Sequence, residues 1–172
     1  MPPNSGPAAC CGRSPMVKYE VIVVGTDGSR TAGTALDHAI TLAQATGAQL
    51  HVVFALDERK ALDFAHVVEA SGDSADVAAF NAGMRNQSKE ICDAAIAAAE
   101  AAAVQCYAQA RPGDAAAVLM EVAGELRADL LVVGNRGMTG MRRMLGSVPN
   151  TISHHAPCSV LIVQTDASDE EQ

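Results

Sequence analysis

Continuous apolar runs recur along the chain and end at a glycine or at a change to polar residues. The four clearest runs lie at residues 19–25, 49–55, 129–134 and 159–164. Both faces of a strand inside a parallel sheet are covered, so its apolar residues are continuous rather than alternating. The pattern predicts four buried parallel strands. A shorter run at 105–110 predicts another, ended by residues 111–113, which include Pro112 and Gly113.

Helical spacing of apolar residues fills the segments between these strands. Ser29 is the predicted N-cap of a first helix, which ends at Gly47. The alanine-rich stretch 77–104 predicts a long helix because alanine has the highest helix propensity. Asp114 is the predicted N-cap of a third helix, and Ser147 of a fourth.

Strands that alternate with helices predict an α/β fold with a single domain, an open parallel sheet of five strands with helices on both faces. We place this domain at residues 17–165. Residues 1–16 are rich in proline and glycine and predict a disordered N-terminal tail. Residues 166–172 predict an acidic C-terminal tail, and residues 56–76 carry only a weak helical pattern.

The net charge of the chain limits the kinds of partner that it is expected to bind. The 172 residues include 12 basic and 20 acidic side chains, which give a net charge of -8. An acidic surface is repelled by nucleic acid and by anionic lipid, so neither is an expected partner. No apolar run reaches the ~18 residues that suggest a membrane span, and residues 1–16 lack the apolar segment of a secretion signal. We therefore expect a cytoplasmic protein.

The five cysteines do not have the spacing of a metal site. Cys92, Cys106 and Cys158 lie among apolar residues, which predicts small buried side chains. Cys10 and Cys11 lie in the proline-rich tail, where a thiol switch is the alternative to an exposed pair without a role.

Two loops at strand ends carry the candidate chemistry. Residues 134–150 contain four glycines, three arginines and no acidic residue. Glycines allow close approach of backbone N–H groups to a ligand, and the helix predicted to begin at Gly146-Ser147 offers its N-terminus to a phosphate. The alternative is a solvated arginine face on a turn.

Asp27 supplies the chemistry of the other loop, directly after the first strand. Its carboxylate suits ribose hydroxyls or Mg²⁺, and the alternative is a turn residue that bonds the next helix. Dinucleotide, P-loop and hydrolase-nucleophile motifs are absent from the sequence, and no general base lies beside a nucleophile. The loops therefore favour a binding protein over an enzyme.

The chain resembles the universal stress protein family from Val17 to Thr165. The segments that carry the resemblance are YEVIVVGTDGS, LHVV, RPGD and ADLLVVGNRGMTGMRRMLGSVPNTISHHAPCSVLIV. The resemblance implies a Rossmann-like sheet of order 3-2-1-4-5 and a homodimer. It implies ATP, with or without Mg²⁺, as ligand. Cyclic AMP is the alternative ligand, and weak ATPase or autophosphorylating activity occurs in some members.

The family's nucleotide site corresponds by position to ten residues of this chain. They are Gly25, Asp27, Val52, Val133, Gly134, Arg136, Gly137, Gly146, Ser147 and Val148. Asp27 corresponds to the ribose and metal contact, Val52 to the backbone contact with adenine, and Gly146–Val148 to the triphosphate cradle. The loop between Gly137 and Gly146 is one residue shorter than in ATP-binding members of the family, which shifts its backbone by up to ~3.5 Å.

The last strand predicts how the chain assembles. Val160, Leu161, Ile162 and Val163 form an apolar strand that the implied order places at a sheet edge. Antiparallel pairing with the same strand of a second copy satisfies both edges, so we expect a homodimer. The other function considered is a homodimeric interaction protein that needs no ligand.

Overall fold

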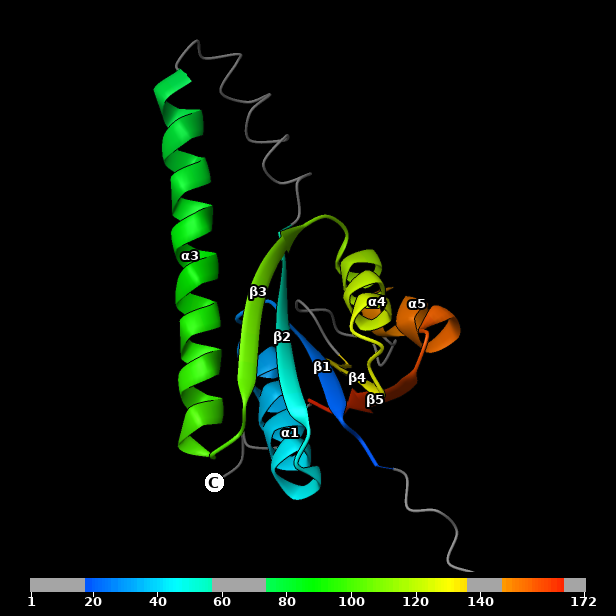
Figure 1. The fold of residues 1–172 in the computed structure, drawn as a ribbon. Helices are drawn as coiled ribbons and strands as arrows, with labels where there is room; N and C mark the ends of the chain where they lie inside the picture. The colour runs from blue at the N-terminus through cyan, green and yellow to red at the C-terminus, as the bar shows by residue number, and fades with distance from the viewer. Residues whose placement is uncertain (1–17, 57–73, 136–146, 166–172) are drawn as a thin grey trace, which may run out of the picture.

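Five parallel strands form one sheet in the computed structural model, which describes residues 18–56, 74–135 and 147–165, with backbone alone at 74–81. The strands are β1 (Val21–Thr26), β2 (Gln49–Leu56), β3 (Cys106–Pro112), β4 (Leu130–Gly134) and β5 (Ser159–Val163). Their order is β3-β2-β1-β4-β5 and every neighbouring pair is parallel (Figure 1). The predicted fold class and strand order are confirmed. The predicted tails at 1–16 and 166–172 lie outside the described residues.

Helices cover both faces of the sheet. The described helices are α1 (Arg30–Thr46), α3 (Ser74–Ala101), α4 (Ala115–Glu125) and α5 (Ser147–His155). One hydrophobic core lies between the sheet and α1 with α3, and a second lies between the sheet and α4 with α5. Figure 1 shows α3 running past the end of the sheet. None of the helices that the structure describes is long and apolar enough to cross a membrane.

Strand β1 lies at the centre, which explains its continuous apolar sequence. Ile22 and Val24 belong to the first core and Val23 to the second, and all three side chains are fully buried. Successive side chains of a strand point to opposite faces. Because helices cover both faces of the sheet, neither face of this strand is exposed, and its central residues are apolar.

The predicted caps of α1 and α4 are confirmed. Ser29 Oγ accepts from the N–H of Ala32 at 3.1 Å, and Gly47 ends α1 in the left-handed conformation with φ 72°. Asp114 Oδ1 accepts from the N–H groups of Ala116 and Ala117, each at 3.1 Å. Ser147 is the first residue of α5 rather than a residue preceding it.

Strand β3 continues to Pro112, so the prediction that residues 111–113 end it was wrong. The N–H of Gly113 bonds to the carbonyl of Leu56 at 2.9 Å. Alternate residues of a parallel strand direct their backbone groups to the same side, so the nitrogen of Pro112 faces away from β2. Because β3 is an edge strand, the missing N–H of proline removes no bond of the ladder.

Helix α3 begins and ends three residues earlier than the predicted 77–104. Ala103 has φ 55°, and the N–H of Val104 bonds back to the carbonyl of Ala99 at 2.9 Å. Val104 is 6% exposed and packs in the first core. Alanine propensity favours a longer helix here, but burial of Val104 turns the chain toward β3 instead.

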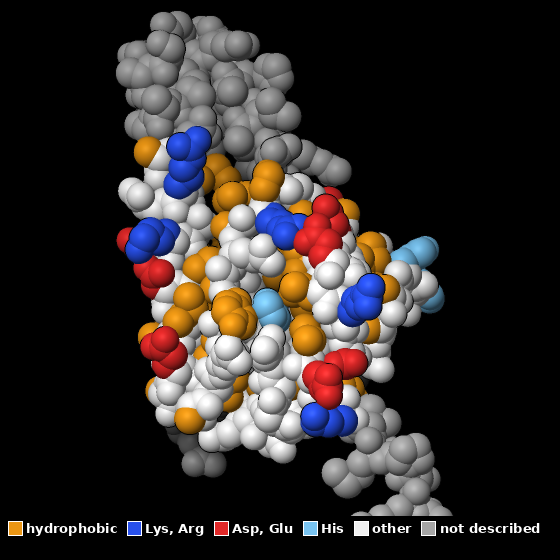
Figure 2. Space-filling view, in the orientation of Figure 1, with side chains coloured by type: hydrophobic (Ala, Val, Ile, Leu, Met, Phe, Trp, Pro, Cys, Tyr) orange, Lys and Arg blue, Asp and Glu red, His pale blue; other side chains and the backbone are white. Residues whose placement is uncertain are grey.

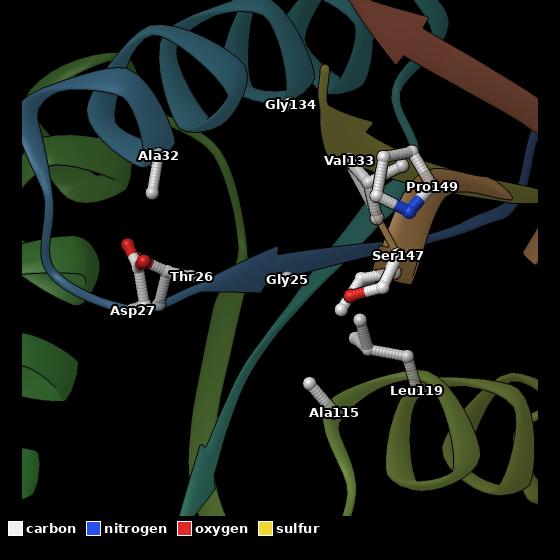
Figure 3. Close-up of a pocket in the computed structure, with 11 residues that line it drawn as sticks. Gly25, Thr26, Asp27, Ala32, Ala115, Leu119, Val133, Gly134, Ser147 and Pro149 are labelled. Atoms are coloured by element: carbon white, nitrogen blue, oxygen red, sulfur yellow. The ribbon is translucent and has the colours of Figure 1, made fainter. Parts of the chain in front are cut away.

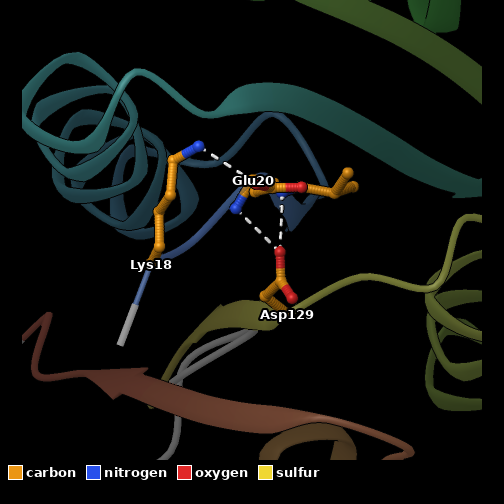
Figure 4. A network of polar contacts seen from close by, with 4 residues as sticks. Lys18, Glu20 and Asp129 are labelled. Carbon is orange, nitrogen blue, oxygen red and sulfur yellow. Dashed lines mark hydrogen bonds and ion pairs between the residues drawn. The ribbon is translucent and has the colours of Figure 1, made fainter. Parts of the chain in front are cut away.

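Asp129 ties the beginnings of β1 and β4 together (Figure 4). Its Oδ2 accepts from the N–H of Glu20 at 2.7 Å and from the N–H of Val21 at 3.0 Å, across 108 residues for the second bond. Lys18 pairs with Glu20 at 3.0 Å on the surface beside it. The two backbone donors lower the pKa of Asp129.

An aromatic pair lies on the part of β2 and β3 that faces away from α3. The His51 and Tyr107 rings stack with centroids 5.0 Å apart, and Tyr107 remains 47% exposed. Partial burial lowers the pKa of His51. Figure 2 shows hydrophobic side chains at the surface over these two strands, between α3 and α4.

Candidate functional site

A pocket opens at the carboxyl ends of β1 and β4 (Figure 3). The pocket is open to solvent, and about 620 Å³ of empty space lies in and at the mouth of it. Its walls come from five elements, which are the end of β1, the end of β4, the first turns of α4 and α5, and one residue of α1. The lining residues are Gly25, Thr26, Asp27, Ala32, Ala115, Leu119, Val133, Gly134, Ser147, Val148 and Pro149.

The sheet topology explains why the pocket lies there. From β1 the chain builds outward through β2 to β3, and it then returns to place β4 and β5 on the other side of β1. The connections that leave β1 and β4 therefore diverge and leave a crevice between them. Open parallel sheets bind their ligands at such a switch point.

Asp27 lies on one side of the pocket, and its carboxylate takes part in a local turn. Oδ1 accepts from the N–H of Ser29 at 2.9 Å, while the N–H of Gly28 bonds to Thr26 Oγ1 at 3.2 Å. The interpretation of Asp27 as a turn residue at the start of α1 is thus confirmed. The turn also fixes the direction of the carboxylate, which is compatible with a role in binding.

Gly28 allows this loop to pack against α3. Its φ is 76°, which favours glycine, and an added Cβ would lie 2.5 Å from Ile91 Cδ1. The loop at Asp27 is therefore fixed in two ways, by the hydrogen bonds of its turn and by its contact with α3.

The opposite wall is apolar and closely packed. Leu119 of α4 is 3% exposed, and its Cδ1 would lie 2.7 Å from a Cβ added at Gly25. Val148 and Pro149 of α5 continue this wall, and Pro149 is tolerated because it lies in the first helical turn. Figure 3 shows Asp27 and Ser147 on opposite sides of Gly25. The pocket thus joins a carboxylate, an apolar wall and a helix N-terminus.

Six of the ten residues predicted from sequence line this pocket. They are Gly25, Asp27, Val133, Gly134, Ser147 and Val148. Arg136, Gly137 and Gly146 lie outside the described residues. Val52 is not among the lining residues: it pairs with Val24 and Ala108 inside the sheet, and its side chain is buried in the first core. Its predicted backbone contact with adenine stays a prediction.

Five lining residues were missed by sequence reasoning. They are Thr26, Ala32, Ala115, Leu119 and Pro149. Thr26 lies between two predicted residues, and Pro149 follows Val148, so spacing alone could have found both. Leu119 belongs both to the second core and to the pocket wall, and an apolar residue at helical spacing gives no separate signal for the second role.

The described thiols are all free, and burial raises their pKa values. The prediction of buried side chains holds for Cys92, whereas Cys106 and Cys158 are half-buried. The pKa of Cys106 rises to about 11. A thiol with so high a pKa is protonated near neutral pH and is a weak nucleophile. Cys10 and Cys11 lie outside the described residues.

Comparison with known proteins assigns the chain to a family. The sequence model of the universal stress protein family matches residues 18–164. A universal stress protein of Staphylococcus haemolyticus is 30% identical over 159 residues, which cover 91% of each chain.

Solved structures of the family have the same fold, and two of them are compared with this chain. One is a universal stress protein in complex with cAMP, 32% identical with a TM-score of 0.62, which covers 87% of this chain and all of its own. The other is the universal stress protein of Archaeoglobus fulgidus in complex with dAMP, 20% identical with a TM-score of 0.58. It covers 86% of this chain and all of its own. The chain therefore belongs to the universal stress protein family.

Proposed function

We propose that this protein binds an adenine nucleotide, with ATP as the leading ligand, in the pocket between β1 and β4. The observation that carries the proposal is the meeting of Asp27, the glycine-lined ends of both strands and the first turn of α5 at the switch point of the sheet. The cAMP and dAMP complexes of relatives support an adenine nucleotide. Its occupancy would regulate a partner or the dimer in a stress response.

Each wall of the pocket would contact a different part of the nucleotide. Asp27 accepts hydrogen bonds from ribose hydroxyls, or shares a Mg²⁺ with the phosphates, as one carboxylate does in many nucleotide sites. The apolar wall around Leu119 takes the base. The N-terminus of α5 faces the phosphates, joined by Arg136, Gly137 and Gly146 of the glycine loop.

Binding without turnover fits the chemistry of these walls. Asp27 is the only ionisable side chain among the described lining residues, and its Oδ1 already accepts from Ser29. Hydrolysis of ATP needs a group that positions and deprotonates water. Phosphate release at the background rate is therefore the expected result with ATP.

Cyclic AMP is the second candidate ligand. The cAMP-bound relative is 32% identical over nearly the whole domain. Titration calorimetry with ATP, ADP, cAMP, adenosine and GTP separates these ligands. Tighter binding of cAMP than of ATP would replace the leading ligand, and absence of binding to all five at millimolar concentration would favour the interaction protein that needs no ligand.

Asp27→Ala tests the carboxylate in the same titrations. We expect ATP affinity to fall by about 1.5–3 kcal/mol, the strength of a hydrogen bond to a charged group. Asp37→Ala is the matched control, since Asp37 is an exposed acid of α1 outside the pocket lining. Equal ATP affinity in the two variants would contradict the role of Asp27.

Ser147→Asp tests the phosphate end. Ser147 is exposed at the first position of α5, where an acidic residue favours the helix. The added charge should weaken ATP about tenfold or more by repulsion and leave neutral adenosine unchanged. Ser147→Asn is the neutral control, and equal effects on ATP and adenosine would place the phosphates elsewhere. Gly146→Arg, in the loop outside the described residues, should abolish binding of ATP by filling the cradle.

The homodimer remains part of the proposal, with β5 as its interface. β5 is an edge strand, and Val160, Leu161 and Ile162 are only half-buried. The carbonyl of Val163 accepts from the N–H of Asn135, the residue after β4, so by alternation Ile162 directs its N–H outward. Ile162→Pro should therefore sediment as a monomer. Leu161→Pro should also damage the sheet, because by the same alternation the N–H of Leu161 faces β4. A wild-type chain that sediments as a monomer at tens of micromolar would refute the dimer.

A further inference from the structure

Asn135 stands at the junction of the pocket and the outer edge of the sheet. It directly follows Gly134, which lines the pocket, and it directly precedes the arginine-containing glycine loop. Its backbone N–H bonds to the carbonyl of Val163 at 2.8 Å, which extends the pairing of β4 with β5 by one residue. The start of the loop is therefore attached to the end of β5.

The side chain of Asn135 adds a second attachment. Its Oδ1 accepts from the N–H of Thr165 at 2.9 Å and from the hydroxyl of Thr165 at 2.6 Å, across 30 residues of sequence. Thr165 is 6% exposed, one of the two buried polar residues in the described part of the chain. We call these two bonds the Asn135–Thr165 clasp. Solvent competes little for bonds made at so buried a residue.

We infer that Asn135 is a positioning residue that couples occupancy of the nucleotide pocket to the end of β5. The inference rests on the proposed nucleotide function. A nucleotide in the pocket contacts Gly134, whose position depends on Asn135, the next residue, and the clasp holds Asn135 in place. Because the clasp also fixes Thr165, the second residue after β5, the same bonds connect the ligand with the apolar edge strand.

Thermodynamic linkage makes the inference quantitative. If the clasp strengthens nucleotide binding by a given factor, nucleotide must strengthen the clasp by the same factor. A factor of about five to ten lies at the lower end of usual couplings between sites. The amide proton of Thr165 is the direct reporter, since it donates to Asn135 Oδ1 and exchanges only when that bond opens.

The experiment combines nucleotide titration with amide exchange measured by NMR on the full chain. Asn135→Ala, which removes both bonds, should bind ATP about five- to tenfold more weakly. Thr165→Val, which removes the hydroxyl bond alone, should show a smaller loss, and Thr165→Ser, which keeps the hydroxyl, should bind like the wild type. Thr46→Val is the control, because Thr46 also donates its hydroxyl to a carbonyl, at 2.8 Å, but on α1. It should leave the ATP affinity unchanged.

Amide exchange in the wild type supplies a readout that a purely structural role would not move. Saturating nucleotide should slow exchange of the Thr165 amide by about the factor lost in Asn135→Ala. The amide of Gln49, bonded to Glu20 at the opposite end of the sheet, should not respond. If Asn135→Ala fails to fold, the exchange of the Thr165 and Gln49 amides in the wild type and the ATP affinity of Thr165→Val still test the coupling.

The outcomes separate the two proposals. A wild type that binds nucleotide while Asn135→Ala binds equally well, or while Thr165 exchange does not respond, overturns the coupling and leaves the proposed function intact. A wild type that binds none of the nucleotides overturns the proposed function and the coupling together.

Discussion

Replacing Gly25 by alanine adds one methyl group at the floor of the pocket. The new Cβ would lie 2.7 Å from Leu119 Cδ1 and 3.2 Å from Cδ2, closer than carbon atoms approach. Gly25 does not have a left-handed φ, so the backbone itself accepts alanine. Leu119 is 3% exposed and has little room to move. Overpacking of this kind costs about 1–3 kcal/mol, offset by ~0.5–1 kcal/mol because alanine suits regular structure better than glycine.

We therefore expect Gly25→Ala to lower the free energy of unfolding by about 1–2 kcal/mol. The clash involves the tip of Leu119, so removing that tip should relieve it. Leu119→Ala alone should cost about 2–5 kcal/mol, and the double variant should be more stable than the sum of the two losses by about 1 kcal/mol.

Guanidinium unfolding followed by far-ultraviolet circular dichroism measures these values, since the chain has no tryptophan. Gly33→Ala is the control, because a methyl group there meets no described atom within 4 Å, and it should stabilise α1 by about 0.5–1 kcal/mol. A Gly25→Ala variant as stable as the wild type, or additive losses in the double variant, would refute the packing argument. Gly25→Ala should also weaken ATP binding, because its added methyl group lies at the floor of the pocket.

Three further variants test separate contacts. Asp129→Asn should cost about 1 kcal/mol at neutral pH, reduced from the value for a buried charged bond because solvent reaches the carboxylate. Since folding lowers the pKa of Asp129, its contribution is complete above the unfolded value of ~3.9 and is lost as pH falls through the folded pKa, so the difference between variant and wild type should vanish in acid. Gly28→Ala should cost about 2–4 kcal/mol from its φ of 76° and its contact with Ile91, and Ile91→Ala should recover the part due to contact. Asp114→Ala should cost about 1 kcal/mol by removing the N-cap of α4, as measured in the same unfolding assay.

Features set by nearby residues could be predicted from the sequence. The apolar run at β1, the caps Ser29 and Asp114, and the stop at Gly47 depend on burial or on neighbours within a few positions. Asp27 was also found, because a carboxylate directly after a buried strand is a local signal. The family resemblance then supplied the strand order, which composition and periodicity do not contain.

Contacts between distant segments could not be predicted in this way. The bonds of Asn135 with Thr165, and the position of Leu119 beneath Gly25, join residues that no local pattern relates. The extent of β3 was mispredicted for the same reason. Proline ends an inner strand, but an edge strand tolerates it where its nitrogen faces away from the neighbouring strand. Sequence indicated which loops meet, and the three-dimensional arrangement decided which side chains touch.

Pro112 has a consequence for the size of the assemblies that this sheet can form. A sheet with two similar open edges can add copies at both and grow into an open-ended filament. The outward donors of β3 are limited by alternation to Cys106, Ala108 and Ala110, because Pro112 has no N–H to offer. The β5 edge is apolar and carries no proline. In the proposed homodimer, pairing through β5 would leave the proline-containing β3 edges outermost, so growth would stop after a single pairing event.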